Sequence, residues 1–168
     1  MYLLDSNVFI EAKQRYYGLD FSPAFWDWLD RSFKAQALAS IDRIGQELRD
    51  RNDDLTVWAK QHKHIFLPVD AATQPSFQKL SAWTMDPSLP YSQEARFTFM
   101  AKGDYQLVAY AHAHGYVVVT HEVAAPQAKK IIKIPDACGA LGVTCADLFA
   151  VIRETNAKFV LAGDPGSR

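Results

Sequence analysis

Apolar residues along the chain fall into two patterns, short unbroken runs and longer stretches with helical spacing. Two of the runs predict strands: residues 2–5, which end in Asp5, and residues 116–120, which read YVVVT. Apolar and β-branched runs of this length are typical of strands that are buried on both faces of a parallel sheet. A further stretch at 130–134 predicts a third strand. The pattern therefore indicates a sheet built from short strands.

Between these runs, apolar residues recur every three or four positions, which predicts amphipathic helices. Ser22 followed by Pro23 is a strong helix-start signal, and Gly115 is suited to end the helix before it. The predicted helices cover residues 6–13, with Ser6 or Asn7 as the cap, and residues 22–33, 40–48, with Ser40 as the cap, 53–59, 73–83, 92–100, 104–114 and 145–154. Helices that alternate with short strands predict an α/β sandwich with a short central parallel sheet, in which helix predominates.

Length and composition indicate one domain. The chain has 168 residues, of which 49% are hydrophobic, so we expect a single domain at 1–155 and a C-terminal tail at 156–168. The net charge of −1 gives no global basic field, so any nucleic-acid contact must come from a local patch. Two cysteines are too few for a disulfide scaffold. No signal peptide or membrane-spanning run is evident, so we expect a soluble, cytoplasmic protein without a membrane partner.

Four acidic residues occupy positions that favour chemistry. Asp5 ends the first predicted strand, and Glu122 follows the 116–120 strand by two residues. The carboxyl ends of parallel strands meet at one sheet edge, where open α/β sheets place their sites. Asp104 lies in the first turn of its helix, and Glu47 lies beside the apolar stripe of the 40–48 helix. Each acid alone has an ordinary structural explanation, but together they predict a carboxylate cluster.

A carboxylate cluster needs a counter-charge, because close carboxylates repel one another and raise each other's pKa values. Magnesium or manganese suits a site built only from oxygen ligands, and either ion retains water and binds phosphate. Asn7 and Thr120 stand beside the strand-end acids in the sequence, where an amide and a hydroxyl can orient the ligands or a bound water. The sequence thus predicts a site that holds a divalent cation.

These motifs resemble those of the PIN-domain ribonucleases, and most closely the VapC-like toxins of bacterial toxin–antitoxin pairs. The resemblance rests on LLDSN around Asp5, SIDRIGQEL with Glu47, KGDYQLVAYA with Asp104, and THE with Glu122 after VVV, and it extends from residue 1 to about 154. It implies a PIN-like α/β/α sandwich and a metal-dependent endoribonuclease that hydrolyses RNA phosphodiesters. It also implies that these acids form the catalytic set.

The resemblance further implies roles and partners. Asp5, Asp104 and Glu122 would hold Mg²⁺ or Mn²⁺, and Glu47 would complete the cluster or orient the attacking water. The commoner pattern has aspartate at the position of Glu122, which leaves open whether Glu122 binds the metal directly or through water. The expected partners are an RNA substrate, a cognate antitoxin, which we associate with the helix-turn-helix type for this subgroup, and a second copy of the chain in a homodimer.

Other interpretations stay open. A catalytically weak PIN-like module could bind RNA or protein without cutting, and a DNA-directed nuclease would use the same acids. A phosphatase resembling the haloacid-dehalogenase family would use Asp5 as a nucleophile, but it requires a second aspartate where this chain has Asn7. Tyr16 and Tyr17 could stack on single-stranded bases, although core packing explains such tyrosines more simply.

Overall fold

The computed structural model describes residues 1–160 and contains a five-stranded sheet in which every neighbouring pair of strands is parallel. The strands are β1 (Tyr2–Leu4), β2 (Leu38–Ile41), β3 (Phe66–Leu67), β4 (Val117–Val119) and β5 (Cys145–Ala146). Their order across the sheet is β3-β2-β1-β4-β5, which makes β1 the central strand. The predicted parallel sheet, with strands at 2–5 and 116–120, is confirmed.

Helices make up most of the molecule. They are α1 (Ser6–Glu11), which continues as a π-helix (Ala12–Tyr16), α2 (Pro23–Lys34), α3 (Asp42–Arg49), α4 (Asp54–Gln61), α5 (Gln74–Thr84), α6 (Gln93–Ala101), α7 (Gly103–His114), α8 (Ile134–Leu141) and α9 (Leu148–Glu154). Two short 3₁₀ segments, Lys63–Ile65 and Ala71–Thr73, precede β3 and α5. Of the helices formed by residues 1–160, none is long and apolar enough to cross a membrane.

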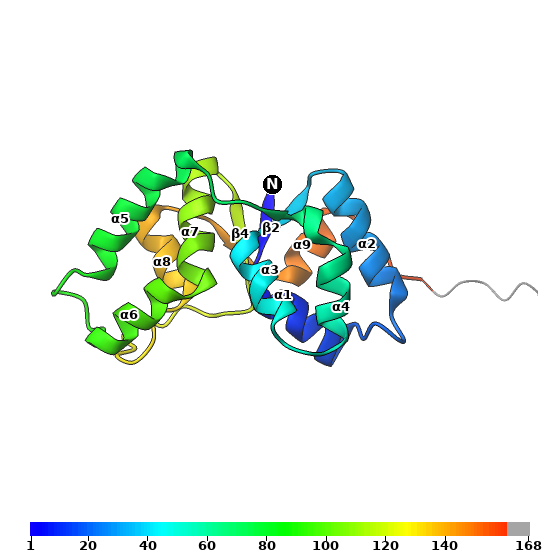
Figure 1. Cartoon of the computed structure of the whole chain (residues 1–168), viewed down its shortest axis with the longest axis horizontal. Helices are drawn as coiled ribbons and strands as arrows, with labels where there is room; N and C mark the ends of the chain where they lie inside the picture. Colours follow the sequence, from blue (N-terminus) through cyan, green and yellow to red (C-terminus); the bar gives the residue numbers. More distant parts are fainter. Residues whose placement is uncertain (161–168) are drawn as a thin grey trace, which may run out of the picture.

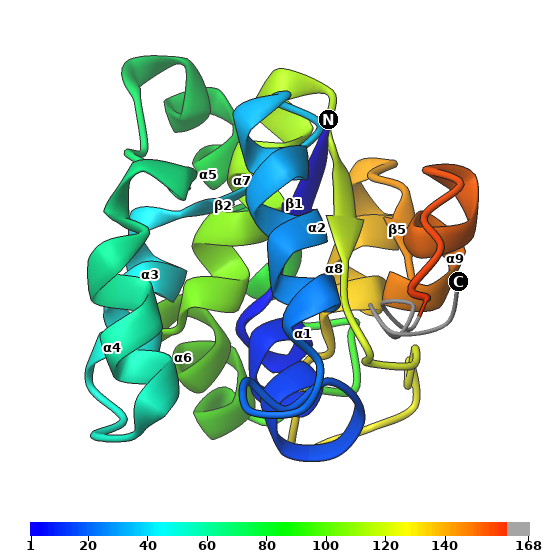
Figure 2. The same cartoon turned by 90° about the vertical axis from the view of Figure 1, so that its right-hand side faces the viewer.

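The helices form layers on the two faces of the sheet. Figure 1 shows α5, α6, α7 and α8 on one side of the strands and α1, α2, α4 and α9 on the other. In Figure 2, turned by 90°, α2 lies in front of β1. Leu3, Leu4, Val118 and Val119 of the central strands are fully buried between these layers. The predicted helix-rich α/β/α sandwich is therefore confirmed.

Several local predictions are wrong, and packing explains each difference. Residues 38–41 form β2 instead of starting a helix, since all four are buried and the Ser40 hydroxyl donates to the backbone oxygen of Leu4 at 2.6 Å. Asp5, not Ser6 or Asn7, caps α1, because its carboxylate accepts from the backbone nitrogen of Ser6.

Two further differences lie near the C-terminus. Residues 130–133 form no strand but lead into α8, which begins at Ile134 with a proline in its first turn. The predicted helix at 145–154 begins only at Leu148, because residues 145–146 pair with β4 as β5 and Asp147 caps α9. Within the predicted tail, Phe159 packs edge-on against Phe25, with ring centroids 6.0 Å apart, and residues 161–168 lie outside the described residues.

Candidate active site

Chain topology brings the four predicted acids to one edge of the sheet. Asp5 follows β1 directly, and Glu122 follows β4, which pairs with β1 in parallel. Helix α3, which carries Glu47, begins right after β2 on the other side of β1. Helix α7 leads the chain back toward the start of β4, so its first turn, with Asp104, lies at the carboxyl edge of the strands. From β1 the chain continues to β2 and β3 on one side of the sheet, whereas β4 and β5 lie on the other side. The carboxyl edge between β1 and β4 is therefore the switch point of the sheet, where open α/β sheets bind their ligands.

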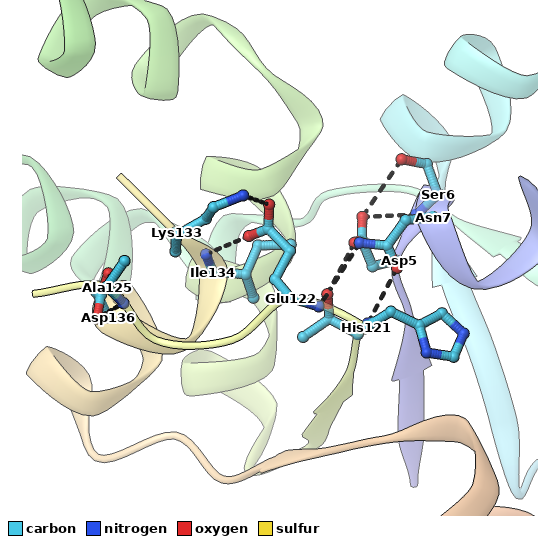
Figure 3. Close-up of polar contacts among 10 residues, drawn as sticks. Asp5, Ser6, Asn7, His121, Glu122, Ala125, Lys133, Ile134 and Asp136 are labelled. Atoms are coloured by element: carbon cyan, nitrogen blue, oxygen red, sulfur yellow. Dashed lines mark hydrogen bonds and ion pairs between the residues drawn. The ribbon is translucent and has the colours of Figure 1, made fainter. Parts of the chain in front are cut away.

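Asp5 is the most buried acid of the cluster, at 2% exposure. Its Oδ1 accepts from the Ser6 backbone nitrogen at 2.6 Å, and its Oδ2 accepts from the Thr120 hydroxyl at 3.0 Å (Figure 3). Burial, together with the charges of Asp104 and Glu122, raises the pKa of Asp5 to about 7, although the two hydrogen bonds oppose the rise. Within residues 1–160, no Lys, Arg or His forms an ion pair with Asp5. The carboxylate therefore lacks a compensating charge.

Asn7 and Thr120 lock the loops after β1 and β4 together. The Asn7 side-chain amide donates to the Thr120 hydroxyl oxygen at 3.1 Å and accepts from the His121 backbone nitrogen at 3.2 Å. The Glu122 backbone nitrogen also donates to the Thr120 hydroxyl oxygen at 3.1 Å. These donors occupy the lone pairs of Thr120, so its proton is directed at Asp5. Figure 3 shows these contacts converging beside Asp5.

Asp104 is the second acid with a strongly perturbed titration. Burial, together with the charges of Glu122 and Glu47, raises the pKa of Asp104 to about 6, although Lys102 opposes the rise. Among the described residues, no ion pair joins Asp104 to a basic side chain. Asp5, which is buried, and Asp104, which is half-buried, thus form a pair of carboxylates in which the charge of Asp104 acts on Asp5.

Glu47 contacts the backbone at the start of α7. Its Oε1 accepts from the Gly103 backbone nitrogen at 3.0 Å, and Arg43 lies 3.8 Å from the same oxygen. A Cβ on Gly103 would lie 2.7 Å from the end of the Ile44 side chain and 2.9 Å from Glu47 Oε1, so a larger residue would force these side-chain ends to shift. Glu47 therefore fixes the turn that presents Asp104.

Glu122 already has two partners. Its Oε1 lies 2.8 Å from the Lys133 ammonium, and its Oε2 accepts from the Ile134 backbone nitrogen at 2.8 Å, at the start of α8 (Figure 3). A carboxylate at this position also interacts favourably with the helix dipole. Glu122 therefore anchors α8 to the loop after β4 while its charge raises the pKa values of Asp5 and Asp104.

Replacing Glu122 with alanine is expected to lower the free energy of unfolding by about 2–3 kcal/mol, because the Lys133 ammonium and the Ile134 backbone nitrogen both lose their acceptor. Chemical denaturation measures the change. The matched control is Asp20→Ala, which removes an exposed loop carboxylate and should stay within about 0.5 kcal/mol of wild type. Equal stability of the two variants would contradict the anchoring role of Glu122.

A small pocket adjoins the acids. It has a volume of about 110 Å³, and its lining includes Asp104 and Glu122 together with Lys102 and Lys130. Phe99 and Ile132 supply part of its apolar wall. Carboxylates and ammonium groups thus face the same small space, which is the pairing needed to hold a cation and an anion side by side.

The structure brings Asp5 and Asp104 together and places Asn7, Thr120, Glu47 and Glu122 around them. Among residues 1–160, no three His, Cys, Asp or Glu side chains form a group that could hold a metal ion by themselves. The metal-binding and catalytic roles of the acids therefore stay predictions. The donor chemistry fits a hard divalent cation, because the buried Asp5 and the half-buried Asp104 both have raised pKa values and no ion-pair partner among the described residues.

Sequence reasoning missed three residues of the site. Gly103 could have been found, since a glycine before Asp104 at a helix start signals a close backbone approach. Lys102 had a weaker signal, its position beside Asp104. The pairing of Lys133 with Glu122 had none, because the two residues are separated by eleven positions and α8 was not predicted.

Residues 2–159 match the family described as "Domain of unknown function (DUF4411)". The chain belongs to this family. No curated protein matches the sequence. The match spans every described strand and helix, so all the predicted site residues lie within the family domain.

Three solved structures are similar to this chain, and two of them include a DNA fragment. VapBC2 from Rickettsia felis, bound to a DNA fragment from its promoter, aligns with a TM-score of 0.54 at 11% identity over 87% of this chain and 97% of that chain. FitAcB from Neisseria gonorrhoeae gives 0.52 at 18% identity over 86% and 96%, and FitAB bound to an IR36 DNA fragment gives 0.52 at 17% over 88% and 94%. The predicted resemblance to VapC-like PIN-domain proteins is therefore confirmed for the fold.

Proposed function

We propose that this protein is a metal-dependent endoribonuclease and the toxin of a toxin–antitoxin pair. The observation that carries the proposal is the pair of carboxylates without an ion-pair partner among the described residues, the buried Asp5 and the half-buried Asp104, at the switch point of a PIN-like sheet. Burying charge without a partner is costly, and such cost is typical of functional sites. A divalent cation would supply the missing charge.

Asp5 and Asp104 would hold Mg²⁺ or Mn²⁺. Lys133 and the Ile134 backbone nitrogen already occupy the oxygens of Glu122, so Glu122 would attract the cation through its negative charge or bind it through a water. Magnesium commonly binds proteins through one or two carboxylates and completes its shell with water and substrate phosphate, so a small ligand set suffices. When bound, the ion supplies Lewis acidity for activating water and for neutralising phosphate charge.

The remaining residues position the reacting groups. Thr120 and Asn7 keep the Asp5 carboxylate in one orientation, and Glu47 keeps the first turn of α7 in place. Lys102 and Lys130, on the wall of the pocket, offer ammonium groups to the phosphate oxygens of an RNA strand. Attack by water on phosphorus needs no covalent enzyme intermediate, so the chain acts by positioning and electrostatic stabilisation.

The expected partners follow from the same proposal. The similar structures are toxin–antitoxin complexes, two of them bound to DNA, which supports a cognate antitoxin for this chain. We retain the helix-turn-helix type of antitoxin and the homodimer as predictions. A toxin that cleaves cellular RNA acts in the cytoplasm, and we propose that location.

Incubation of the protein with total RNA is expected to yield discrete fragments in Mg²⁺ or Mn²⁺ and none in EDTA, because the carboxylate pair needs the cation to act on a phosphodiester. Gel electrophoresis of the products tests this. Protein carrying Asp104→Asn, purified in the same way, controls for contaminating nucleases and should be inactive. Fragments that persist in EDTA would refute metal dependence, and cleavage of single-stranded DNA alone would favour the DNA-directed nuclease.

A further inference from the structure

Three aromatic rings form a cluster beside the acid site. Tyr16, at the end of the π-helix, lies 6.2 Å from the His121 ring and 5.4 Å from the Phe149 ring, measured between centroids. His121 and Phe149 are 6.0 Å apart, so each ring contacts both others. Tyr16 is 42% exposed, whereas the other two are partly buried. We call these three residues the aromatic platform.

The structure separates the two tyrosines that the sequence left equivalent. Tyr17 stacks on Phe25, with ring centroids 4.1 Å apart and an angle of 5° between the planes, and Phe159 packs edge-on against it. Tyr17 is thereby committed to the hydrophobic core. Tyr16 keeps an exposed ring that packs against His121 and Phe149. Only Tyr16 is available for stacking with a ligand.

The platform is joined to the site through backbone and side-chain contacts. His121 directly follows Thr120, and its backbone nitrogen donates to Asn7, which in turn contacts Thr120. Figure 3 shows the His121 ring pointing away from Glu122 and Lys133. Asp5 is thus flanked by the lysine-lined pocket near Glu122 and by the platform at His121.

The size of the pocket explains why a second surface is needed. Its volume of about 110 Å³ is well below the roughly 300 Å³ at which pockets begin to enclose whole small molecules. A phosphate group can enter this space, but a complete nucleotide cannot. The base attached to that phosphate must therefore lie outside the pocket, on the surface next to the acids.

We propose that the aromatic platform stacks an unpaired base of single-stranded RNA next to the scissile phosphate, with Tyr16 as the contacting ring. The inference rests on the proposed function. Exposed aromatic rings combined with nearby cations are the usual way in which proteins hold single strands, since every base has a face that can stack. Arg15, which is exposed and directly precedes Tyr16 in the π-helix, supplies such a cation.

Binding of a short single-stranded RNA that carries 2-aminopurine at successive positions tests the platform. The assay uses the full chain in EDTA, where no cleavage is expected, and records fluorescence anisotropy together with quenching. Replacing Tyr16 with alanine should weaken binding roughly 5- to 150-fold, the loss expected for one stacked base, and should abolish quenching at one position. Tyr16→Phe keeps the ring and should stay within about twofold of wild type.

Two controls make the result specific. Phe97→Ala removes another exposed ring, on α6, and should leave affinity and quenching unchanged. A duplex of the same sequence has no free base and should be insensitive to Tyr16→Ala. If Tyr16→Ala binds single-stranded RNA as tightly as wild type does, and the wild-type protein cleaves RNA, the platform alone would be overturned. Loss of self-association in sedimentation, without any loss of RNA binding, would overturn it in favour of a dimer contact. A wild-type protein that neither binds nor cleaves RNA would overturn the proposed function as well.

Discussion

Replacing Asp5 with asparagine is expected to abolish RNA cleavage and, in metal-free protein at pH 8, to raise the free energy of unfolding by about 1–2 kcal/mol. The gain arises because burial and the neighbouring carboxylates raise the pKa of Asp5 from 3.8 to about 7, so the ionised group is destabilised in the folded state by a few kcal/mol. Asparagine removes that charge but loses the bond from Thr120, which offsets part of the gain.

The stability gain expected for Asp5→Asn depends on pH in a defined direction. Because the pKa of Asp5 is higher in the folded chain, the folded protein binds more protons between about pH 4 and pH 7, and stability falls as pH rises through this range. Asp104, with its pKa raised to about 6, adds to the same trend. The advantage of Asp5→Asn should therefore be greatest at pH 8 and disappear near pH 5, as followed by thermal unfolding in EDTA.

Addition of Mn²⁺ or Mg²⁺ should reverse the order of stability. The cation binds the folded wild type and supplies the missing charge, so it should raise the melting temperature of wild type and have little effect on Asp5→Asn. Asp20→Asn, an exposed substitution, serves as the control and should follow wild type in every condition. Retained cleavage in Asp5→Asn, or lower stability than wild type at pH 8, would contradict the assignment of Asp5 as an uncompensated site carboxylate.

The sequence was most informative where one physical rule acts alone. Asp5 and Glu122 could be placed because each follows an apolar run, and parallel strands bring their carboxyl ends to one edge. Strands β2 and β3 could not be found in this way. The Ser40 hydroxyl in β2 donates a hydrogen bond to the backbone oxygen of Leu4 in β1, so serine is tolerated at this buried strand position. In the sequence, the same serine resembles a helix cap. Strand β3, Phe66–Leu67, is too short to give a periodic signal and forms only through pairing with β2.

The chemistry within the site was less predictable than its location. Whether a carboxylate is free or paired depends on residues distant in sequence, as Glu122 shows through its bond to Lys133. The separation of Tyr16 from Tyr17 depends likewise on α9 and α2, which supply Phe149 and Phe25. Local patterns fix which residue types are present, whereas the tertiary fold decides which of them keep their polar atoms or rings available.

Arg96 illustrates how much stability rests on one polar residue away from the acids. The side chain is 7% exposed and lies on α6, where its guanidinium donates to the backbone oxygens of Thr84, Asp86, Leu89 and Tyr91. These oxygens belong to the last residue of α5 and to the segment that joins α5 to α6. The segment has no strand pairing of its own, so the guanidinium organises it much as a bound cation would.

Replacing Arg96 with methionine is expected to lower the free energy of unfolding by about 3–5 kcal/mol, because a side chain of similar length fills the space but leaves the backbone oxygens without a donor. Arg96→Lys should recover only part of the loss, since one ammonium cannot reproduce the planar fork of a guanidinium. Chemical denaturation measures both changes.

The matched control is Arg31→Met on α2, which makes the same exchange at an exposed position and should change stability by no more than about 0.5 kcal/mol. A loss below about 1 kcal/mol for Arg96→Met would show that water replaces the guanidinium among these oxygens. A large loss of stability would show that Arg96 also supports the pocket beside the acids, because α6 carries Phe99 of the pocket wall and leads directly into Lys102. The loop joining α5 to α6 and the pocket would then depend on the same buried cation.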